Sequence, residues 1–293
     1  MNKVSIIVTS FNELEDLKES IPALLSLNYS KKDYEIIVMD ESTDLRVVKY
    51  LKSFGSKIKL FHFNERKGAV KCKKIAVEKS KNPFFVLFGA DCVPEKNWLK
   101  IVMKKFKENK NYGFVSTYDI TGGTCTAYLK KAVIDARGFS DKFNEKGTGM
   151  RDDTDLAFRV WDSGYNSFFG YIANVKHEHK INPGKINALK YAWRRVMLQR
   201  FDPLLYREHP VRAIKFLGIT HGFWIPLRKD YNKATGQWMG KASMKLSSPT
   251  GVVFLEGETP VHRIIIFFGG ICYAILAKFS RLYGSIIYGK LLI

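Results

Sequence analysis

The sequence predicts an α/β protein with a mostly parallel sheet and helices on both faces of that sheet. In the first 120 residues, short runs of β-branched and aromatic residues alternate with segments of helical periodicity. The runs are continuous apolar stretches, as is typical of strands that are buried on both faces. Strands that alternate with helices favour parallel pairing, because each helix carries the chain back to the start of the next strand.

In this first part, strands and helices are expected in strict alternation. The expected strands cover residues 4–11, 34–40, 57–63 and 84–88, and the expected helices cover 13–27, 44–54, 67–81 and 95–107. In the first helix, spacings of three and four residues place one apolar stripe on a single face. That stripe consists of Leu14, Leu17, Ile21, Leu24 and Leu25.

Beyond residue 112 the alternation is less regular. Leu156, Val160 and Trp161 share one face of an expected helix, which Gly164 ends. Pro203 is expected to end a later, basic amphipathic helix. The expected elements are a strand over 112–120, a Gly-bearing loop, short strand and helix within 121–139, a helix over 153–164, a strand over 165–175 and the basic helix over 189–201.

The C-terminal segment differs in kind from the rest of the chain. Residues 264–277 are uncharged and apolar, but this run is shorter than the roughly 18–20 residues that a membrane-spanning helix needs. Three interpretations stay open: an interfacial membrane helix, a tilted spanning helix, and a core or dimer helix. Basic residues and tyrosines mixed with the apolar ones suit a bilayer interface; they are Arg263, Lys278, Arg281, Lys290, Tyr273, Tyr283 and Tyr288.

The chain is strongly basic, with 48 Lys and Arg against 28 Asp and Glu and a formal net charge of +20 at pH 7. Such a surface attracts nucleic acid, acidic lipid headgroups or phosphorylated substrates. The alternative is a Lys-rich composition that only keeps the protein soluble. Nucleic acid is not expected as a partner, because the sequence has no RRM, KH, zinc-finger or helix-turn-helix signature.

Cysteine usage and the N-terminal residues indicate the compartment. The chain starts almost at once with the strand-like run 4–11 and has no secretory signal pattern. We therefore expect its active site to face the cytosol. Scattered cysteines without C-x-x-C spacing argue against a zinc knuckle or a disulfide framework and fit a reducing compartment; they are Cys72, Cys92, Cys125 and Cys272.

Carboxylates stand where strands or turns end. Asp40 follows one apolar run and Asp91 follows another, while Asp152 and Asp153 come just before a helical pattern. The ends of parallel strands converge on a common crevice, where α/β proteins bind their ligands. Acidic side chains gathered there suit a metal ion, a diphosphate and a proton to be removed. This layout indicates a nucleotide-sugar transferase.

Four segments in order carry a resemblance to a known family. They are VSIIVTSFNE, EIIVMDESTD, GADCVP and RDDTDLAFR, spread over roughly residues 3–180. Together they resemble the family 2 inverting glycosyltransferases of the GT-A fold. The resemblance implies a GT-A sheet with helices on both faces, and C-terminal to it we expect a helical, membrane-associating appendage.

The resemblance implies that the end of the first strand receives the base and ribose of the nucleotide. The matching residues that we expect to bind are Thr9, Phe11 and Glu13. A strand end followed by a helix N-terminus offers free N–H groups to an acidic ligand. The alternative is that Ser10 or Asn12 only caps the helix.

Two further positions match nucleotide-binding residues of the family. Asp40 matches the aspartate that accepts a hydrogen bond from the base; alternatively, it forms a turn with Ser42 and Thr43. Lys67, followed by Gly68, matches a basic segment near the diphosphate. The alternative is a helix surface exposed to solvent, made by Lys71, Lys73, Lys74, Lys79 and Lys81.

Asp91 matches the metal-binding Asp-x-Asp motif of the family and is expected to contact both the metal and the diphosphate. Gly89 stands where the first Asp of that motif belongs. The resemblance implies Mg²⁺ or Mn²⁺, for which carboxylates are suitable ligands. His177 or His179 is expected to complete the site. The alternative is that both histidines lie on the surface.

Asp152 and Asp153 match the Glu-Asp pair of the family, and Asp153 is expected to be the catalytic base. Inversion at an anomeric carbon needs one base to deprotonate the acceptor hydroxyl. Repulsion from Asp152 would raise the pKa of Asp153. The alternative is an acidic helix start, and Asp155 is expected to have a structural role.

Basic residues follow the matched region. Gln199, Arg200 and Phe201 do not fit the Q-x-x-R-W motif of processive members of the family, so we expect a non-processive enzyme. Arginines on segments 189–201 and 204–216 suit anionic lipid or a phosphorylated lipid acceptor, or form an exposed surface. They are Arg194, Arg195, Arg200, Arg207 and Arg212.

Taken together, these features predict an inverting glycosyltransferase with a GT-A domain over residues 1–205 and a basic, apolar region over 206–293. Its donor would be a nucleoside-diphosphate sugar, and its acceptor a lipid-linked saccharide or polyprenyl phosphate used in glycan or glycolipid assembly. We expect it at the cytoplasmic face of the cell membrane, either peripheral or anchored by the C-terminal segment. The alternative is a nucleotide-sugar-binding protein without transfer activity.

Overall fold

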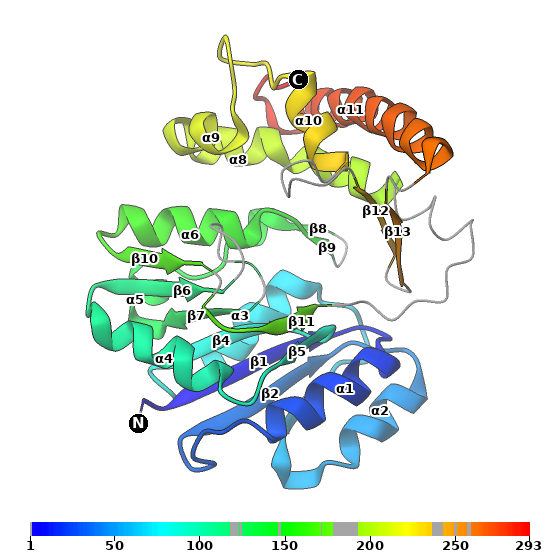
Figure 1. Cartoon of the computed structure of the whole chain (residues 1–293). Helices are drawn as coiled ribbons and strands as arrows, with labels where there is room; N and C mark the ends of the chain where they lie inside the picture. The colour runs from blue at the N-terminus through cyan, green and yellow to red at the C-terminus, as the bar shows by residue number, and fades with distance from the viewer. Residues whose placement is uncertain are drawn as a thin grey trace. The chain divides into compact units, whose positions relative to one another are not determined.

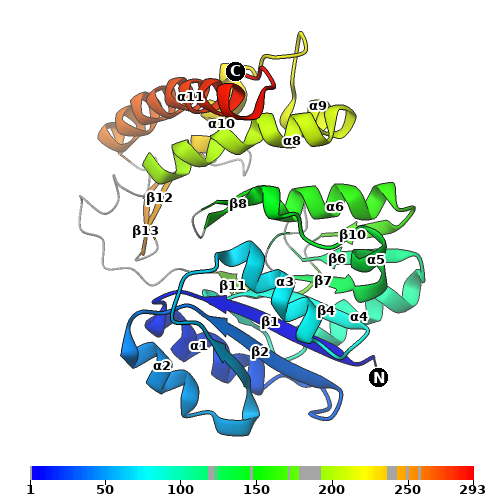
Figure 2. The same ribbon diagram turned by 180° about the vertical axis from the view of Figure 1, so that it is seen from behind.

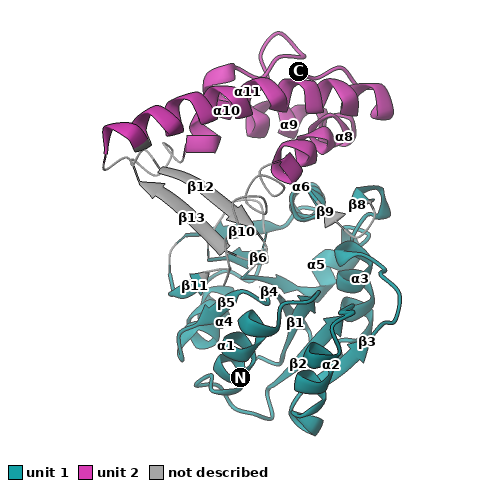
Figure 3. Ribbon diagram, turned by 90° about the vertical axis from the view of Figure 1, so that its right-hand side faces the viewer, with its two compact units in different colours: residues 1–178 teal, residues 179–293 magenta. Residues whose placement is uncertain are grey.

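A computed structural model describes residues 2–117, 123, 125–145, 148–170, 172–177, 193–235, 243–248, 251–256 and 259–293. Figures 1 and 2 show its elements. The chain forms two compact units, Met1–Glu178 and His179–Ile293 (Figure 3). The sequence had placed a domain boundary near residue 205, whereas the described residues from 193 to 205 belong to the second unit.

The first unit is built on a seven-stranded sheet with strand order β10-β6-β7-β4-β1-β2-β3 (Figure 1). Strand β1 is parallel to both β2 and β4, and β2 is parallel to β3. Strand β7 is antiparallel to its neighbours β4 and β6, while β10 is parallel to β6. The expected mostly parallel sheet is confirmed. Its strands are β1 Val4–Ser10, β2 Tyr34–Asp40, β3 Lys59–His62, β4 Phe84–Gly89, β6 Tyr112–Ser116, β7 Thr126–Leu129 and β10 Asn166–Phe169.

Helices cover both faces of this sheet, as expected. Val4, Ile6 and Val8 of β1 point into the core beneath α1, α2 and α4 (Figure 1). Ile7 points to the opposite core, beneath α3, α5 and α6 (Figure 2). Burial on both faces explains why the strands read as continuous apolar runs. The helices are α1 Leu14–Leu25, α2 Leu45–Lys52, α3 Ala69–Lys79, α4 Trp98–Glu108, α5 Lys130–Asp135 and α6 Asp152–Asp162.

Short elements complete the first unit. The 3₁₀ turns η1 Gly55–Lys57 and η2 Asp141–Phe143 lie in connections. Two small antiparallel pairs stand outside the main sheet: β5 Cys92–Pro94 with β11 Val175–His177, and β8 Asn144–Glu145 with β9 Thr148–Gly149.

The second unit is mainly helical. Its elements are η3 Leu198–Phe201, α8 Asp202–Glu208, α9 Pro210–Leu217, α10 Leu227–Thr235, the antiparallel pair β12 Ser243–Ser248 and β13 Gly251–Glu256, and α11 Pro260–Tyr288. The expectation that Pro203 ends a helix is wrong. Pro203 lies in the first turn of α8, where a residue without an N–H group is tolerated.

Helix α11 is much longer than the apolar run that marked it in the sequence. It has 29 residues, which corresponds to about 43 Å at 1.5 Å per residue. Its stretch Arg263–Tyr288 is long and apolar enough to cross a membrane, by length and composition. In the protein it packs on η3, α8 and α10. At Gly284 a Cβ atom would come within 2.1 Å of the Arg200 carbonyl oxygen, so α11 and η3 are in backbone contact.

Charged side chains on the inner face of α11 form a buried cluster. Arg281 donates through Nε to Asp202 at 2.9 Å, and through both terminal nitrogens to Asp230 at 2.7 and 2.6 Å. Lys278 lies 3.1 Å from Asp230. Arg281 is 2% exposed. Burial of these charges is tolerated because each one has a partner of opposite sign.

The outer face of α11 is apolar and exposed. Large hydrophobic side chains recur at spacings of three and four residues along it, so they form one stripe on the helix. We call this the α11 stripe; its members are Val261, Ile264, Ile265, Phe268, Ile271, Ile275, Phe279, Leu282 and Ile286.

We predict that Arg281→Met destabilises the second unit. Methionine keeps an unbranched side chain but removes the charge. Asp202 and Asp230 are then buried without their main partner, which costs about 3–5 kcal/mol. Hydrogen exchange followed by mass spectrometry should show loss of protection in α8, α10 and α11. Arg263→Met, at an exposed position of the same helix, is the control and should leave protection unchanged. Equal protection in Arg281→Met and in the wild type would contradict the prediction.

Candidate active site

The ends of the parallel strands lie at one edge of the main sheet. The register pairs Thr9 of β1 with Gly89 of β4, and Ser10 with Asp40 of β2. Asp40 in turn pairs with His62, the last residue of β3. The residues that follow these strands therefore share the edge at which α/β proteins bind their ligands.

Asp40 is fully buried, and both of its carboxylate oxygens have partners within the protein. Oδ1 accepts a hydrogen bond from the Ser42 hydroxyl at 2.6 Å, and Oδ2 lies 2.7 Å from Nδ1 of His62. An ionised carboxylate only accepts hydrogen bonds, so Nδ1 of His62 is the donor in this contact; in the neutral imidazole, Nε2 is then an acceptor. The His62 side chain is 23% exposed and is thus the accessible member of the pair.

Asn12 joins the loops that follow β1 and β2. Its backbone N–H donates to the Ser42 hydroxyl at 2.8 Å, and its side-chain carbonyl accepts from the backbone N–H groups of Thr43 and Asp44, both at 3.0 Å. The backbone of Asn12 is left-handed, with φ of 60°, a conformation that Asn adopts more readily than most residues. Helix α1 starts after Glu13 without a side-chain cap, so the alternative of Ser10 or Asn12 as its cap is wrong.

Thr9, Phe11 and Glu13, the residues expected at the nucleotide, are all partly exposed at the end of β1. The Phe11 backbone N–H donates to Oε2 of Glu13 at 3.4 Å. The guanidinium of Arg66 lies 3.8 Å from the centre of the Phe11 ring, a cation–π contact. Both groups offer flat faces on which a nucleotide base can stack.

Glu41 holds the start of α3. Its Oε1 accepts hydrogen bonds from the backbone N–H of Gly68, at 2.9 Å, and from that of Lys67. The Lys67 ammonium lies 5.2 Å from the centre of the Phe63 ring, and the Lys67 residue as a whole is exposed. Burial beside Glu41 raises the pKa of Cys72 to about 12, so this thiol is not a nucleophile near neutral pH.

Asp91 lies in the turn between β4 and β5 and is partly exposed. Its neighbour Cys92 pairs with His177 in the β5–β11 ladder, so the backbone of His177 runs beside the turn that carries Asp91. The side chain of His177 and all of His179 lie outside the described residues. Within the described ranges, no group of three or more His, Cys, Asp or Glu residues is arranged to hold a metal ion. The carboxylate of Asp91 is an oxygen donor of the kind that Mg²⁺ and Mn²⁺ prefer.

Asp152 and Asp153 begin α6 but differ in their surroundings. Asp152 is 4% exposed and accepts a hydrogen bond from the Lys73 ammonium at 2.7 Å. Asp153 is partly exposed, and its Oδ1 accepts from the Thr154 backbone N–H at 2.7 Å. Burial works to lower the pKa of Lys73, but the two carboxylates outweigh it and leave that pKa above its usual value. The positive charge of Lys73 thus opposes the repulsion between Asp152 and Asp153 that was expected from the sequence.

Asp155, one turn further along α6, makes a structural contact with Arg159. Its carboxylate accepts from Nε of Arg159 at 3.1 Å. Arg159 also donates to the Gly138 carbonyl at 2.6 Å and to that of Ala136. These bonds connect α6 to the end of α5, which supports the structural role expected of Asp155.

Helix α3 connects the two halves of the candidate site. Its N-terminus is held by Glu41, next to Asp40, and Lys73 one turn later holds Asp152. The alternative of a solvent-exposed helix surface does not hold for Lys73, because its side chain is only 19% exposed. Its spacing from Val70 and Val77, both buried on α3, would have placed it on the inner face of the helix.

Sequence reasoning also missed His62, Arg66 and Glu41. For His62 a signal was present, since it lies near the end of the strand expected over 57–63, and that strand is next to the one that carries Asp40 in the order of the sheet. Arg66 and Glu41 lie in loops, where the sequence carries no periodic signal for side-chain direction.

The chain was compared with known proteins. The model of the family "Glycosyl transferase family 2" matches residues 5–164. A dolichyl N-acetyl-α-D-glucosaminyl phosphate 3-β-D-2,3-diacetamido-2,3-dideoxy-β-D-glucuronosyltransferase of Methanococcus voltae is 32% identical over 115 residues, or 38% of this chain and 36% of that protein. Glycosyltransferase AglE of Haloferax volcanii is 24% identical over 100 residues, or 33% of each protein. The matched part thus spans about a third of these relatives.

Solved structures share the fold. Mannosyltransferase PcManGT from Pyrobaculum calidifontis, in complex with GDP-Man and Mn²⁺, superposes with a TM-score of 0.60 at 17% identity, over 96% of this chain and 87% of that one. Residues 1–349 of S. aureus TarS, in complex with UDP-GlcNAc, superpose with a TM-score of 0.55 at 13% identity, over 98% of this chain and 92% of that one. Both share the mostly parallel GT-A arrangement.

The family match covers more than half of the chain, and the sheet is of the GT-A type. The expectation drawn from the four sequence segments is therefore confirmed: this protein belongs to glycosyl transferase family 2.

Proposed function

We propose that the protein is an inverting glycosyltransferase that moves a sugar from a nucleoside-diphosphate sugar to a lipid-linked acceptor in glycan or glycolipid assembly. The observation that carries this proposal is the pair on α6, in which Lys73 binds Asp152 and leaves Asp153 as the more exposed carboxylate. The M. voltae relative, whose name includes a dolichyl phosphate-linked sugar, supports a lipid-linked acceptor. PcManGT and TarS, solved with GDP-Man and UDP-GlcNAc, support a nucleotide-sugar donor.

The donor base binds, in this proposal, at the ends of β1, β2 and β3. Asp40 acts on it through the neutral imidazole of His62: the carboxylate is buried and bonded, and Nε2 of that tautomer accepts an N–H from the base. Phe11 and Arg66 contribute the stacking surface. Thr9 and Glu13 lie at the same strand end and bind the ribose.

The diphosphate binds between Lys67 and Asp91. Lys67 is exposed and its ammonium lies beside the Phe63 ring, from where it can turn toward phosphate oxygens. Asp91, His177 and His179 would hold Mg²⁺ or Mn²⁺ together with the diphosphate; the bound ion would offset negative charge on the leaving group. Gly89 supplies no carboxylate, so the diphosphate has a larger share in holding the metal than in an Asp-x-Asp site.

Asp153 is the base of the proposed reaction. It removes the proton from the acceptor hydroxyl while the acceptor oxygen bonds to the anomeric carbon, and the bond from that carbon to the diphosphate breaks on the opposite face. The proton ends on the Asp153 carboxylate and the nucleoside diphosphate leaves. Asp152, held by Lys73, positions Asp153 and does not take the proton. A phosphate acceptor would already be ionised and would need the base less.

The second unit is proposed to bind the membrane surface without spanning it. Its sequence has 18 Lys and Arg against 5 Asp and Glu, a balance that attracts anionic lipid. The α11 stripe supplies apolar side chains that can enter the headgroup region. The inner face of α11 carries Arg281 and packs on α8, whose Arg207 is exposed. Those charges would have to enter the hydrocarbon core if α11 crossed it.

With an acceptor that offers a hydroxyl group, Asp153→Asn is predicted to reduce transfer by about 100-fold to 10,000-fold, the usual contribution of a positioned general base. The amide has nearly the same shape as the carboxylate, so donor binding should persist. Release of nucleoside diphosphate from donor and acceptor, in single-turnover reactions, measures the effect.

Asp162→Asn is the matched control, because Asp162 is an exposed aspartate at the other end of α6. It should transfer at the wild-type rate. Full activity of Asp153→Asn would overturn its role as the base. A wild-type protein that binds donor but transfers nothing to lipid-linked, saccharide or polyprenyl phosphate acceptors would favour the alternative, a nucleotide-sugar-binding protein without transfer.

Thermal unfolding with UDP, GDP, dTDP, CDP or ADP is predicted to show stabilisation by one nucleotide, larger with Mn²⁺ or Mg²⁺ than without. A ligand that binds only the folded state raises the free energy of unfolding as its concentration exceeds Kd. In Asp91→Asn the metal-dependent part of the stabilisation should disappear. In His62→Ala the stabilisation should fall with metal and without it.

The two variants thus distinguish the contribution of the metal to nucleotide binding from that of the contact between His62 and the nucleotide base. An Asp91→Asn protein that kept the full metal response would show that other residues hold the metal. His62→Ala with unchanged affinity would refute the proposed route from Asp40 to the base. No stabilisation of the wild type by any nucleotide would contradict the transferase proposal itself.

The protein is predicted to float with vesicles of phosphatidylcholine and phosphatidylglycerol, and less so at high salt, because salt screens the attraction between charges. The double variant Phe268→Glu, Phe279→Glu should stay in solution. Both side chains are 64% exposed, so the folded unit tolerates the change. Ile134→Glu, at an exposed apolar position of α5 in the first unit, should float like the wild type. Wild-type flotation of the double variant would exclude the α11 stripe as the lipid contact.

A further inference from the structure

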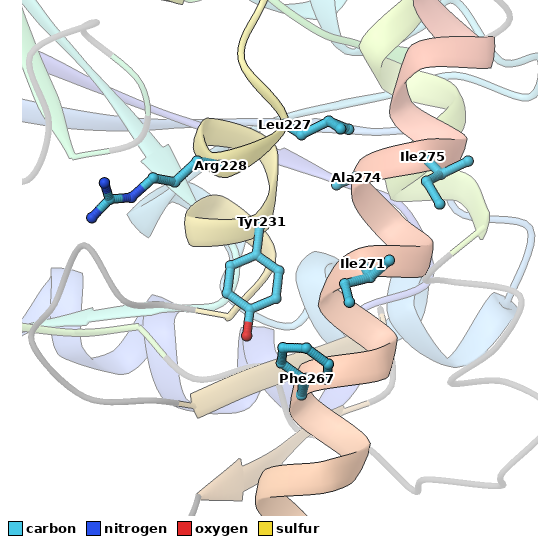
Figure 4. Close-up of a pocket in the computed structure, with 7 residues that line it drawn as sticks. All are labelled: Leu227, Arg228, Tyr231, Phe267, Ile271, Ala274 and Ile275. Atoms are coloured by element: carbon cyan, nitrogen blue, oxygen red, sulfur yellow. The ribbon is translucent and has the colours of Figure 1, made fainter.

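A groove lies between α10 and α11 in the second unit (Figure 4). Its volume is about 360 Å³, near the lower end for small-molecule sites. Ala274, which is 2% exposed, forms its floor. The groove is lined by Leu227, Arg228 and Tyr231 from α10 and by Phe267, Ile271, Ala274 and Ile275 from α11.

The lining is almost entirely apolar. Its aromatic wall is formed by Tyr231 and Phe267, whose ring centres are 6.3 Å apart in an edge-on arrangement. The helices approach closely beside this wall, because a Cβ atom at Gly270 would come within 2.6 Å of the Tyr231 ring. Such a surface binds hydrocarbon and offers a ligand no polar partner except the Tyr231 hydroxyl and the Arg228 guanidinium.

Arg228 is the charged residue of the lining. It is exposed, and within the described ranges it has no hydrogen bond or ion pair with another residue. Figure 4 shows its side chain leaving α10 on the side away from α11, so the guanidinium stands at the outer edge of the groove. A cation in this position is available to an anionic group bound at that edge.

The groove opens onto the surface proposed to meet the membrane. Ile271 and Ile275 belong both to its lining and to the α11 stripe, and they are 37% and 46% exposed. A hydrocarbon chain can therefore pass from lipid into the groove along continuous apolar surface, without being exposed to water.

We propose that this groove binds the phosphate-proximal part of the hydrocarbon chain of a polyprenyl-phosphate acceptor, with the phosphate at Arg228. The inference rests on the proposed function, because it concerns the acceptor of that reaction. In a polyprenyl phosphate the phosphate is attached directly to the chain, which matches a short apolar groove with one cation at its edge. In a phospholipid two polar ester groups separate chain from phosphate, and the lining offers them little. The rest of the chain remains in the bilayer.

The test uses the full-length protein in detergent micelles and a farnesyl phosphate that carries a benzophenone group at the far end of its chain. After irradiation, mass spectrometry is expected to find the label on residues 227–231 and 267–275. Unlabelled farnesyl phosphate should compete. Label elsewhere, or competition by phosphatidylglycerol at the same concentrations as farnesyl phosphate, would overturn the proposal.

Two variants refine this test. Arg228→Ala should raise the farnesyl phosphate concentration for half-maximal competition roughly tenfold, the effect of losing one charge-assisted contact worth about 1.4 kcal/mol, and should leave competition by uncharged farnesol unchanged. Lys229→Ala removes an exposed positive charge at the next position, outside the lining, and should change neither. An equal effect of both variants would show that general positive charge, and not Arg228, attracts the phosphate.

Nucleotide binding by the same preparation separates this proposal from the proposed function. Stabilisation by a nucleoside diphosphate without labelling of α10 and α11 would refute the groove alone. Absence of nucleotide stabilisation would refute the transferase proposal, whatever the labelling pattern.

Discussion

The parallel register of β1, β2, β3 and β4 is the constraint on which the candidate site depends. Because these neighbouring strands run in the same direction, their carboxyl ends meet at one edge of the sheet. The register pairs Ser10 with Asp40, and Asp40 with His62, so one level of the sheet carries three polar side chains. Hydrogen bonds join the loops that follow these strands: the Asn12 side chain accepts from the Thr43 backbone N–H, and Glu41 accepts from that of Gly68. These hydrogen bonds hold the loops to one another at the edge of the sheet.

In the second unit, the pairing of buried charges determines which face of α11 is buried. Lys278 and Arg281 on the long apolar helix α11 would be costly to bury if they had no partners of opposite charge. Asp202 and Asp230 provide those partners, so the charged face of the helix turns inward and the apolar face outward. This arrangement inverts the usual pattern of a surface helix. It is consistent with a unit that stays folded in water and still presents hydrocarbon-like surface to a partner.

Much of the fold could be predicted because the decisive signals are local. Continuous apolar runs such as residues 84–88 are typical of buried parallel strands, and their alternation with helical patterns was sufficient for the sheet. The antiparallel β7 could not be predicted, because Thr126–Leu129 is too short to encode a direction. The full length of α11 was missed for a related reason. Lys278 and Arg281 end the apolar run in the sequence, and their partners Asp202 and Asp230 are remote in the chain.

The candidate site shows the same limit. Asp40, Asp91 and Asp153 could be found because each follows a recognisable strand or begins a helix. The partners that give these residues their properties are distant in sequence, as with Asp152 and Lys73, which are 79 positions apart. Without knowledge of Asp152, a lysine in a helix is most simply placed on the solvent-exposed surface, as Lys73 was in that alternative. Sequence thus indicated where chemistry can occur, while the electrostatic environment followed only from the tertiary contacts.

That environment bears on how Asp152 and Asp153 can divide their roles. Two adjacent carboxylates without a counter-ion would favour binding a shared proton, and a protonated pair is a poor base. Lys73 contacts Asp152, so the three groups together carry one net negative charge instead of two. In the proposed reaction, the positive charge of Lys73 offsets part of the repulsion that Asp152 exerts on Asp153. The buried Asp152 and its lysine partner thus set the charge around the exposed carboxylate that meets the acceptor hydroxyl.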